Sequence, residues 1–311
     1  MIFNATKKNI EKAGQLIKNG DVVAFPTETV YGLGASAYNP KAIAKIYAIK
    51  NRPSFNPLIS HIAEVDFLKE YAQTDERVLA LANQFWPGPL TFILKRKDNN
   101  SALDLACAGL AKISVRMPNH PVALDLIKAA GVPIVAPSAN KSQTISPTTA
   151  KHVQNSLGDA VPMILDAGSC KVGVESTIID VSEKQIVLLR AGGISLETLE
   201  DFLGETILIS DGNPDKPSSP GQMLRHYAPK YTTRINVKTP APDEFYIGFG
   251  DMNGDLNLSP AGDLQEATAN LFLMMHLAEE QNQKKKIAIA PIPNVGLGRA
   301  INDRIKRASY K

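Results

Sequence analysis

Apolar and polar residues alternate with helical and strand-like periods along most of the chain. Apolar residues recur at helical spacing over residues 7–19, which predicts a helix with one buried face. Residues 22–25 are uniformly apolar and predict a short buried strand. A second helix is expected from Pro40 to about Ile49, because Asn39 can cap it and proline suits the first helical position.

The same patterns continue to about residue 208. Further helices are expected at about 75–85, 121–130, 147–156 and 195–203. Strands are expected at 90–94, 113–116, 134–136, 176–181 and 186–190. Strands and helices mixed at this spacing indicate an α/β fold.

The composition changes near residue 209. Residues 211–221 are rich in proline, glycine, serine and aspartate, which disfavour regular structure and predict a linker. Beyond it, strand-like segments at 246–249 and 287–290 flank an amphipathic helix near 264–280, which predicts a second, smaller α/β unit. The predicted organisation is a domain at 1–208, a linker that can act as a lid at 209–231, and a small domain at 232–311.

Bulk composition narrows the class of protein. The chain has 311 residues, of which 44% are hydrophobic and 21% charged, as in folded globular proteins. Its formal charge of +3 is too small to indicate a nucleic-acid coat or a membrane-binding patch. Two cysteines are too few for a disulfide framework, and the sequence shows neither a signal peptide nor an apolar run of membrane-spanning length. We therefore expect a cytoplasmic enzyme with no membrane contact.

Familiar signals of nucleotide and metal chemistry are missing or weak. The chain has no G-x-x-x-x-G-K-[ST] sequence, so it is not a P-loop ATPase. Residues 32–37 match the loose dinucleotide pattern G-x-G-x-x-A, but no helix opens there and no acidic residue follows at the ribose-binding distance. We interpret them as a flexible turn. The five histidines are scattered and form no H-E-x-x-H, so no metal centre built from side chains is expected.

Cations near the ends of predicted elements indicate an anionic ligand. Lys50 and Arg52 begin a stiff, proline-rich loop, where two cations can face a polyphosphate. Taken alone, such a pair more often marks a solvated helix end. Arg116 lies inside an apolar strand and Arg190 ends another, so each needs an internal carboxylate or an anionic ligand as partner. Two such arginines favour an anion-rich substrate.

Two serines have ordinary explanations when taken alone. Ser146 precedes Pro147 and is predicted to cap the helix at 147–156. Capping explains this serine, although a helix N-terminus is also a ready site for an anion. Ser176 would be an ordinary strand residue without further context.

One long block, Phe25-Pro-Thr-Glu-Thr-Val-Tyr-Gly-Leu-Gly-Ala35, is distinctive. In order after it come Lys50-x-Arg52, Pro57-Leu58, Trp86-Pro-Gly-Pro-Leu-Thr91, Val115-Arg-Met-Pro118, Ala136-Pro-Ser-Ala-Asn140, Glu175-Ser-Thr177 and Leu189-Arg-Ala-Gly192. Their order and spacing resemble the threonylcarbamoyl-AMP synthases (YrdC/Sua type) over about the first 205 residues. Residues 219–229 resemble the connector of the long, two-domain members, and the remaining residues resemble their C-terminal domain only loosely.

The resemblance implies both a fold and a reaction. The fold would be a twisted, open, mostly parallel α/β sheet with a large positive concavity. The reaction would be a nucleotidyl transfer in which L-threonine, bicarbonate and ATP give threonylcarbamoyl-AMP and pyrophosphate, with Mg²⁺ carried on the nucleotide. A tRNA threonylcarbamoyl transferase complex would then use the product to modify adenosine 37 of tRNA.

The resemblance also implies roles for individual residues. The residues expected to hold threonine are Thr29, His61, Arg116 and Ser176, with Arg116 pairing the carboxylate. The residues expected to hold ATP are Arg52, Asn56, Ser138, Asn140, Ser146, Arg190, His226 and Tyr227, the last two from the linker. Lys50 and Arg52 would supply the catalytic positive charge, and no side chain is assigned as a general base.

Two other interpretations remain open at this point. A carbamoyl-adenylate-forming relative of the hydrogenase-maturation type would share the fold, but it would carry C-x-x-C pairs that this chain lacks. An RNA-binding protein would use the positive concavity for duplex RNA, which the weak net charge disfavours. Lys284–Lys286 and the basic residues from Arg304 to Arg307 offer weak tRNA contacts, although a solvated face is the better interpretation.

Overall fold

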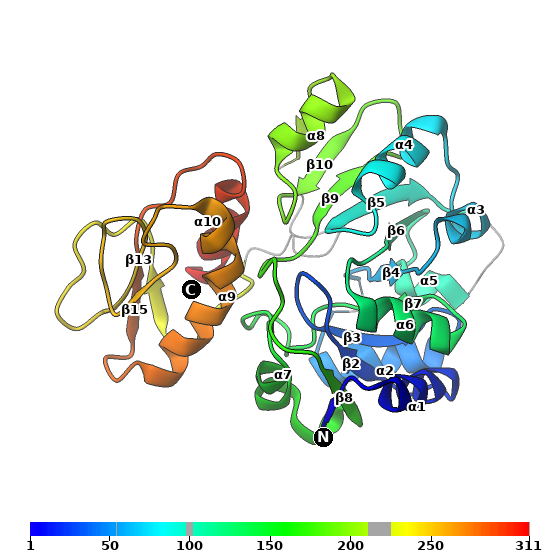
Figure 1. Cartoon of the computed structure of the whole chain (residues 1–311), viewed down its shortest axis with the longest axis horizontal. Coiled ribbons are helices and arrows are strands. Elements are labelled where there is room, and N and C mark those ends of the chain that lie inside the picture. Colours follow the sequence, from blue (N-terminus) through cyan, green and yellow to red (C-terminus); the bar gives the residue numbers. More distant parts are fainter. Residues whose placement is uncertain (54, 98–101, 211–224, 311) are drawn as a thin grey trace.

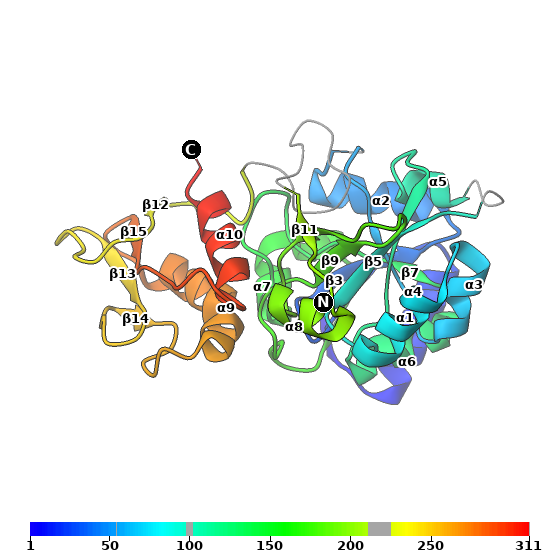
Figure 2. The same cartoon turned by 90° about the horizontal axis from the view of Figure 1, so that it is seen from above.

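The computed structural model describes residues 1–53, 55–97, 102–210 and 225–310. Two bodies lie side by side (Figures 1 and 2). The larger body carries the elements up to residue 209, and the smaller body, yellow to red in the figures, carries those from residue 232 onward. Within the described residues, no helix is long and apolar enough to cross a membrane.

The larger body alternates helices and short strands. Its strands are β1 (Ile2–Asn4), β2 (Val23–Phe25), β3 (Gly32–Ser36), β4 (Ile59–His61), β5 (Leu90–Lys95), β6 (Lys112–Arg116), β7 (Ile134–Val135), β8 (Met163–Asp166), β9 (Thr177–Asp180), β10 (Val187–Arg190) and β11 (Leu208–Ile209). Its α-helices are α1 (Lys7–Lys18), α2 (Pro40–Lys50), α3 (Leu68–Tyr71), α4 (Glu76–Phe85), α5 (Ala102–Ala106), α6 (Pro121–Ala130), α7 (Ala150–Leu157) and α8 (Leu196–Leu203). The smaller body contains β12 (Thr232–Arg234), β13 (Phe245–Gly248), β14 (Leu256–Asn257), α9 (Leu264–Gln281), β15 (Lys286–Ile289) and α10 (Gly298–Ala308).

The strands of the larger body form one open sheet. Among the described strands the order is β1-β8-β2-β3-β7-β4-β6-β5-β9-β10-β11. The parallel pairs are β1–β8, β8–β2, β4–β6, β5–β9 and β10–β11, and the antiparallel pairs fall between them. The smaller body has a separate sheet in the order β12-β15-β13-β14, with parallel pairing throughout. The predicted α/β class, with a large sheet and a second, smaller α/β part, is confirmed.

Local sequence signals explain where several helices begin. The side chain of Asn39 accepts hydrogen bonds from the backbone N–H groups of Lys41 and Ala42, and Pro40 occupies the first helical position of α2. Helix α1 is capped in the same way by Thr6. The apolar stripe of α1 packs into a core with α6 and the neighbouring strands, so the helical periodicity of residues 7–19 is confirmed.

Two local expectations are wrong. Residues 32–36 form strand β3 rather than a flexible turn, because their backbone pairs on both sides with β2 and β7. The helix expected at 147–156 begins at Ala150, and its cap is Thr149, whose side chain accepts from the N–H of His152. Ser146 therefore does not cap this helix. The segment 211–221, on which the linker prediction rests, lies outside the described residues.

The two bodies share a continuous apolar interface. Val30, Ile145 and Val174 of the larger body belong to the same buried cluster as Phe272 and its neighbours in the smaller body. Gly173 adopts a φ of +77°, and a Cβ there would lie 2.3 Å from the backbone oxygen of Ala269. The smaller body therefore packs directly against the loop that leads into β9.

A pair of stacked imidazoles also bridges this interface. His152 of α7 and His276 of α9 lie with ring centroids 3.8 Å apart, and His276 Nε2 donates to the backbone oxygen of Ser146 at 3.1 Å. Burial, together with the charge of His276, lowers the pKa of His152 to about 3. Burial lowers the pKa of His276 to about 4. Both rings are therefore neutral in the folded protein near pH 7.

This pair predicts an acid-sensitive stability. In the unfolded chain both histidines become protonated as the pH falls below their ordinary pKa of 6.5. In the folded chain they stay neutral until the pH reaches about 3 to 4. The contribution of the two neutral histidines to the free energy of unfolding is therefore fully present above pH 6.5. It falls as the pH drops below 6.5, by up to about 1.4 kcal/mol per pH unit for each histidine. We expect the His152→Gln/His276→Gln double variant to show a shallower decline between pH 6.5 and 5 in urea unfolding. An unchanged slope would contradict this account.

Candidate active site

The ends of several strands converge on one cavity in the larger body. The loop after β2 supplies Thr27 and Thr29, β4 supplies His61 and β6 supplies Arg116. Parallel pairing of β4 with β6 places His61 directly opposite Arg116. The cavity is lined by Thr27, Thr29, Val30, Gly32, Arg52, Ile59, His61, Arg116, Ala136, Pro137, Ser138, Glu175, Ser176, Arg190, His226 and Tyr227.

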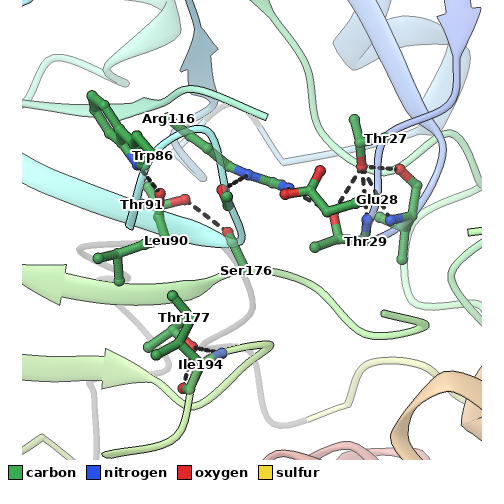
Figure 3. A network of polar contacts seen from close by, with 12 residues as sticks. Thr27, Glu28, Thr29, Trp86, Leu90, Thr91, Arg116, Ser176, Thr177 and Ile194 are labelled. Atoms are coloured by element: carbon green, nitrogen blue, oxygen red, sulfur yellow. Dashed lines mark hydrogen bonds and ion pairs between the residues drawn. The ribbon is translucent and has the colours of Figure 1, made fainter. Parts of the chain in front are cut away.

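Arg116 is the centre of one half of the site. Its Nη2 lies 2.6 Å from Glu28 Oε1, its Nη1 donates to Thr29 Oγ1 at 3.0 Å, and its Nε donates to the backbone oxygen of Gly88. Arg116 and Glu28 are 3% and 6% exposed, so this is a buried ion pair. Figure 3 shows the guanidinium lying between Glu28 and Thr29 on one side and Ser176 and Thr91 on the other. An internal carboxylate therefore partners Arg116.

Hydroxyl groups on both sides of Arg116 are fixed by neighbouring hydroxyls. Thr27 Oγ1 lies 2.8 Å from Thr29 Oγ1 and donates to the backbone oxygen of Val30 (Figure 3). Ser176 Oγ lies 2.7 Å from Thr91 Oγ1, a residue of β5. These buried hydroxyls are oriented before any ligand arrives, which favours specific recognition of a small polar molecule.

Arg190 occupies the end of β10 beside Ser176. Its Nε and Nη2 donate to the backbone oxygen of Ser176, and Nη2 also donates to Ser176 Oγ at 3.1 Å. Gly192 lets these two segments of the backbone approach each other, because a Cβ there would lie 2.4 Å from the backbone oxygen of Glu175. Burial lowers the pKa of Arg190 to about 10.

Lys50 and Arg52 lie at the C-terminal end of α2. Lys50 Nζ donates to the backbone oxygens of Ser138, at 2.6 Å, and Asn140, and the residue is 1% exposed. Arg52 donates to the backbone oxygens of Asn56 and Pro57. Burial, with the charge of Arg52, holds the pKa of Lys50 well below its usual range, and burial lowers the pKa of Arg52 to about 10. Carbonyl dipoles rather than carboxylates therefore hold these two cations.

Two buried histidines border the cavity from different sides. Burial, and then the charge of Arg116, lower the pKa of His61 to about 3, and its Nδ1 donates to the backbone oxygen of Ile59. His226 comes from the segment that precedes the smaller body. Burial and four neighbouring cations, led by Arg52, hold its pKa well below 6.5. Both imidazoles are therefore neutral and can exchange hydrogen bonds with an uncharged or anionic ligand.

Ser146 joins the site through a carboxylate. Its Oγ donates to Glu175 Oε1 at 2.6 Å, while Glu175 Oε2 accepts from Arg304 Nε at 3.0 Å. Arg304 belongs to α10 and is 0% exposed, so the expectation that it forms part of a solvated basic face is wrong. The lysines at 284–286 are exposed, as that expectation requires.

The structure brings most of the predicted site residues together. Thr29, His61, Arg116, Ser176, Arg52, Ser138, Arg190, His226 and Tyr227 all line the cavity. Lys50, Asn56, Asn140 and Ser146 do not line it, but they are buried in or beside the elements that do. Lys50 touches Ser138, and Ser146 touches Glu175. Asn140 Nδ2 instead donates to the backbone oxygen of Thr144, which gives that amide a local structural role.

Sequence reasoning missed three charged residues of the site. Glu28 and Glu175 both stand in the blocks that carried the resemblance, yet they received no role. Their signal was available, because each buried arginine needed an anionic partner. Arg304 had no such signal, since it stands in a run of basic residues on a helix whose buried face only the packing defines.

The charges of the side chains in and around the cavity favour an anionic ligand. Lys50, Arg52 and Arg190 are held by backbone oxygens and the Ser176 side chain in the contacts above, whereas Arg116 and Arg304 each face a glutamate. Burial is the main cause of the lowered pKa values of Lys50, Arg52 and Arg190, and neighbouring cations lower each of them further. Within the described residues no group of three metal-binding side chains occurs. The fold and the site thus define an α/β protein built to receive a polyanion beside a small polar molecule.

Comparisons with known proteins agree with this architecture. Residues 15–192 match the family described as "Telomere recombination", and residues 194–309 match "Threonylcarbamoyl-AMP synthase, C-terminal domain". The chain is 38% identical to threonylcarbamoyl-AMP synthase of Bacillus subtilis, covering 96% of this chain and 92% of that protein. It is 37% identical to the enzyme of Pyrococcus abyssi, with 96% and 94% covered. The chain belongs to the threonylcarbamoyl-AMP synthase family.

The solved structures extend the likeness to the whole chain. The crystal structure of P. abyssi Sua5 complexed with L-threonine superposes with a TM-score of 0.90 at 35% identity, covering 99% of this chain and 97% of that one. Escherichia coli YciO matches 62% of this chain with a TM-score of 0.53 at 22% identity, which supports the fold alone. The C-terminal residues, expected to match the long members only loosely, are therefore a full counterpart of their second domain.

The buried Arg116–Glu28 pair leads to a stability prediction. Replacing Arg116 by methionine leaves the Glu28 carboxylate buried without its cation, which typically costs about 3–5 kcal/mol. We expect urea unfolding of Arg116→Met to show a loss of this size, and the added change Glu28→Gln to restore most of it. Equal stability of the single and double variants would show that Glu28 does not depend on Arg116.

Proposed function

We propose that this chain is an L-threonylcarbamoyladenylate synthase, which converts L-threonine, bicarbonate and ATP to threonylcarbamoyl-AMP and pyrophosphate. The single observation that carries the proposal is the cavity with its excess of buried positive charge beside prearranged hydroxyls. A triphosphate matches the first feature, and an amino acid with a hydroxyl and a carboxylate matches the second. The L-threonine bound to the P. abyssi protein of the same fold supports this assignment.

The threonine half of the site is proposed around Arg116. The substrate carboxylate would pair with the guanidinium, sharing it with Glu28 or displacing Glu28 from it. Thr29, Ser176 and the neutral His61 surround this point and would recognise the side chain. Discrimination against serine then depends on one methyl group, which in a pocket gives about 1–3 kcal/mol.

The ATP half is proposed on the cationic side. Lys50, Arg52 and Arg190 would neutralise charge on the phosphates as the carbamate oxygen attacks the α-phosphorus and pyrophosphate leaves. Asn56, Ser138, Asn140 and Ser146 would complete the nucleotide contacts, with His226 and Tyr227 as a cover that excludes water. Both glutamates of the site are held in ion pairs, so Mg²⁺ would be carried by the phosphates and water rather than by a carboxylate of these two.

The product would pass to a transferase that modifies tRNA. Threonylcarbamoyl-AMP is a mixed anhydride, and its chemistry requires an enzyme that moves the threonylcarbamoyl group to a nucleophile such as adenosine 37. Weak contact with tRNA, and a cytoplasmic location, stay predictions. The hydrogenase-maturation protein HypF shares only the fold, with a TM-score of 0.51 at 20% identity, and gives no support to the carbamoyl alternative.

Pyrophosphate release tests the proposed reaction. The chain is incubated with ATP, bicarbonate and Mg²⁺, and release is compared with no amino acid, L-threonine, L-serine and glycine. We expect release that requires both threonine and bicarbonate and is slower with serine. Equal release without amino acid would contradict the proposal, as would salt-sensitive duplex RNA binding without amino-acid-dependent ATP turnover.

Lys50 offers a sharper prediction with a matched control. Lys50→Met removes a buried charge beside the phosphates, so kcat for threonine-dependent pyrophosphate release should fall about 100-fold. Lys41→Met changes an exposed lysine at the other end of the same helix and should leave the rate within twofold. Similar rates for both variants would remove Lys50 from the proposed catalytic role.

A further inference from the structure

Arg304 is a fully buried cation that the smaller body contributes to the boundary with the active site. It lies on α10, where its Nη1 donates to the backbone oxygen of Ala191 at 2.9 Å and to Asp303 Oδ2 at 2.8 Å. Its Nε donates to Glu175 Oε2 at 3.0 Å. Ala191 directly follows Arg190, and Glu175 directly precedes Ser176. Arg304 therefore reaches both chain segments that carry the cationic end of the cavity.

Glu175 transmits this contact to Ser146. The two carboxylate oxygens are divided between two partners, because Oε1 accepts from Ser146 Oγ while Oε2 accepts from Arg304. Burial alone would raise the pKa of Glu175, but the charges of Arg304 and Arg190 and the bond from Ser146 outweigh it and hold the pKa below its usual range. The ionised carboxylate therefore has a fixed orientation, and so does the Ser146 hydroxyl bound to it.

The same guanidinium supports Tyr227. It lies 5.3 Å from the centroid of the Tyr227 ring, and the ring of Phe272 in α9 stacks on Tyr227 with the two centroids 5.3 Å apart. Tyr227 adopts a φ of +60°, which a non-glycine residue accepts only where its surroundings hold it. Two residues of the smaller body thus hold this residue of the cavity wall in place.

We propose that Arg304 is a positioning residue of the nucleotide site, acting through Glu175 on Ser146 and through its stacking on Tyr227. The inference rests on the proposed function and extends it, because it makes the smaller body a structural part of the ATP site. The competing explanation is that Arg304 only stabilises the interface between the two bodies. It is separable, because α10 carries a second arginine that bridges the bodies elsewhere.

Arg299 provides that matched control. Its Nη2 lies 2.9 Å from Glu197 Oε1 of α8, and the two side chains are 32% and 43% exposed. Glu197 is not among the residues that line the cavity. Arg299→Lys and Arg304→Lys therefore make the same chemical change on the same helix, and each weakens one bridge between the bodies. Of these two arginines, only Arg304 contacts Glu175, the carboxylate that binds Ser146.

The experiment measures binding of the α,β-methylene analogue of ATP by calorimetry, with L-threonine present and on the full chain. We expect Arg304→Lys to weaken binding about tenfold, because a lysine cannot hold Glu175 and Ala191 together in the arginine fork. Arg299→Lys should change binding less than twofold. In a Ser146→Ala background, Arg304→Lys should weaken binding only about threefold, because part of its effect passes through that hydroxyl.

The outcomes separate this proposal from the proposed reaction. The inference would be overturned if Arg304→Lys bound the analogue with wild-type affinity. It would also be overturned if Arg299→Lys lost as much affinity as Arg304→Lys. If Arg304→Lys weakened binding by the same factor with and without Ser146→Ala, Arg304 would not act through Glu175 and Ser146. A wild-type chain that binds the analogue but releases no threonine-dependent pyrophosphate would contradict the reaction and leave the role of Arg304 standing. A wild-type chain that binds no nucleotide would overturn both.

Discussion

The structure depends on the burial of more positive charge than negative charge around one cavity. A buried cation is stable only where hydrogen bonds or opposite charges replace the lost water. Here Lys50 and Arg52 donate to backbone oxygens, Glu28 forms an ion pair with Arg116, and Glu175 forms an ion pair with Arg304 and also interacts electrostatically with Arg190. Burial lowers the pKa of Lys50, Arg52 and Arg190, and neighbouring cations lower each of them further. A bound polyanion would add opposite charge beside these cations, so this imbalance of charge would favour nucleotide binding.

The two glutamates lie in different halves of the proposed site, Glu28 beside the proposed threonine position and Glu175 beside the proposed nucleotide position. Glu28 forms an ion pair with Arg116 at the point where the amino-acid carboxylate is proposed to bind. Glu175 stands at the other end and links Ser146 to the smaller body through Arg304. The interface of the two bodies therefore extends from the stacked rings of His152 and His276 to the cavity, where Arg304 lies over the ring of Tyr227.

The sequence predicted seven of the helices and most of the longer strands because their periodicities are local, whereas helices α3, α5 and α10 were not predicted. The caps at Thr149 and Asn39 show the limit of such reasoning, since Asn39 was identified correctly whereas Ser146 was taken for the cap that Thr149 supplies. Residues 32–36 were misinterpreted because their strand is defined by pairing with distant segments rather than by an apolar alternation. The burial of Arg304 was equally invisible, because only the packing of α10 against the larger body removes it from solvent. Most of the residues named from the resemblance, by contrast, line one cavity.

A crystal structure of the chain with L-threonine and the α,β-methylene analogue of ATP tests the central claim most directly. The account predicts the threonine carboxylate on Arg116 and the phosphates among Lys50, Arg52 and Arg190, with Tyr227 closing the cavity. A nucleotide bound elsewhere would contradict it. So would a threonine molecule that leaves Arg116 without a contact to its carboxylate.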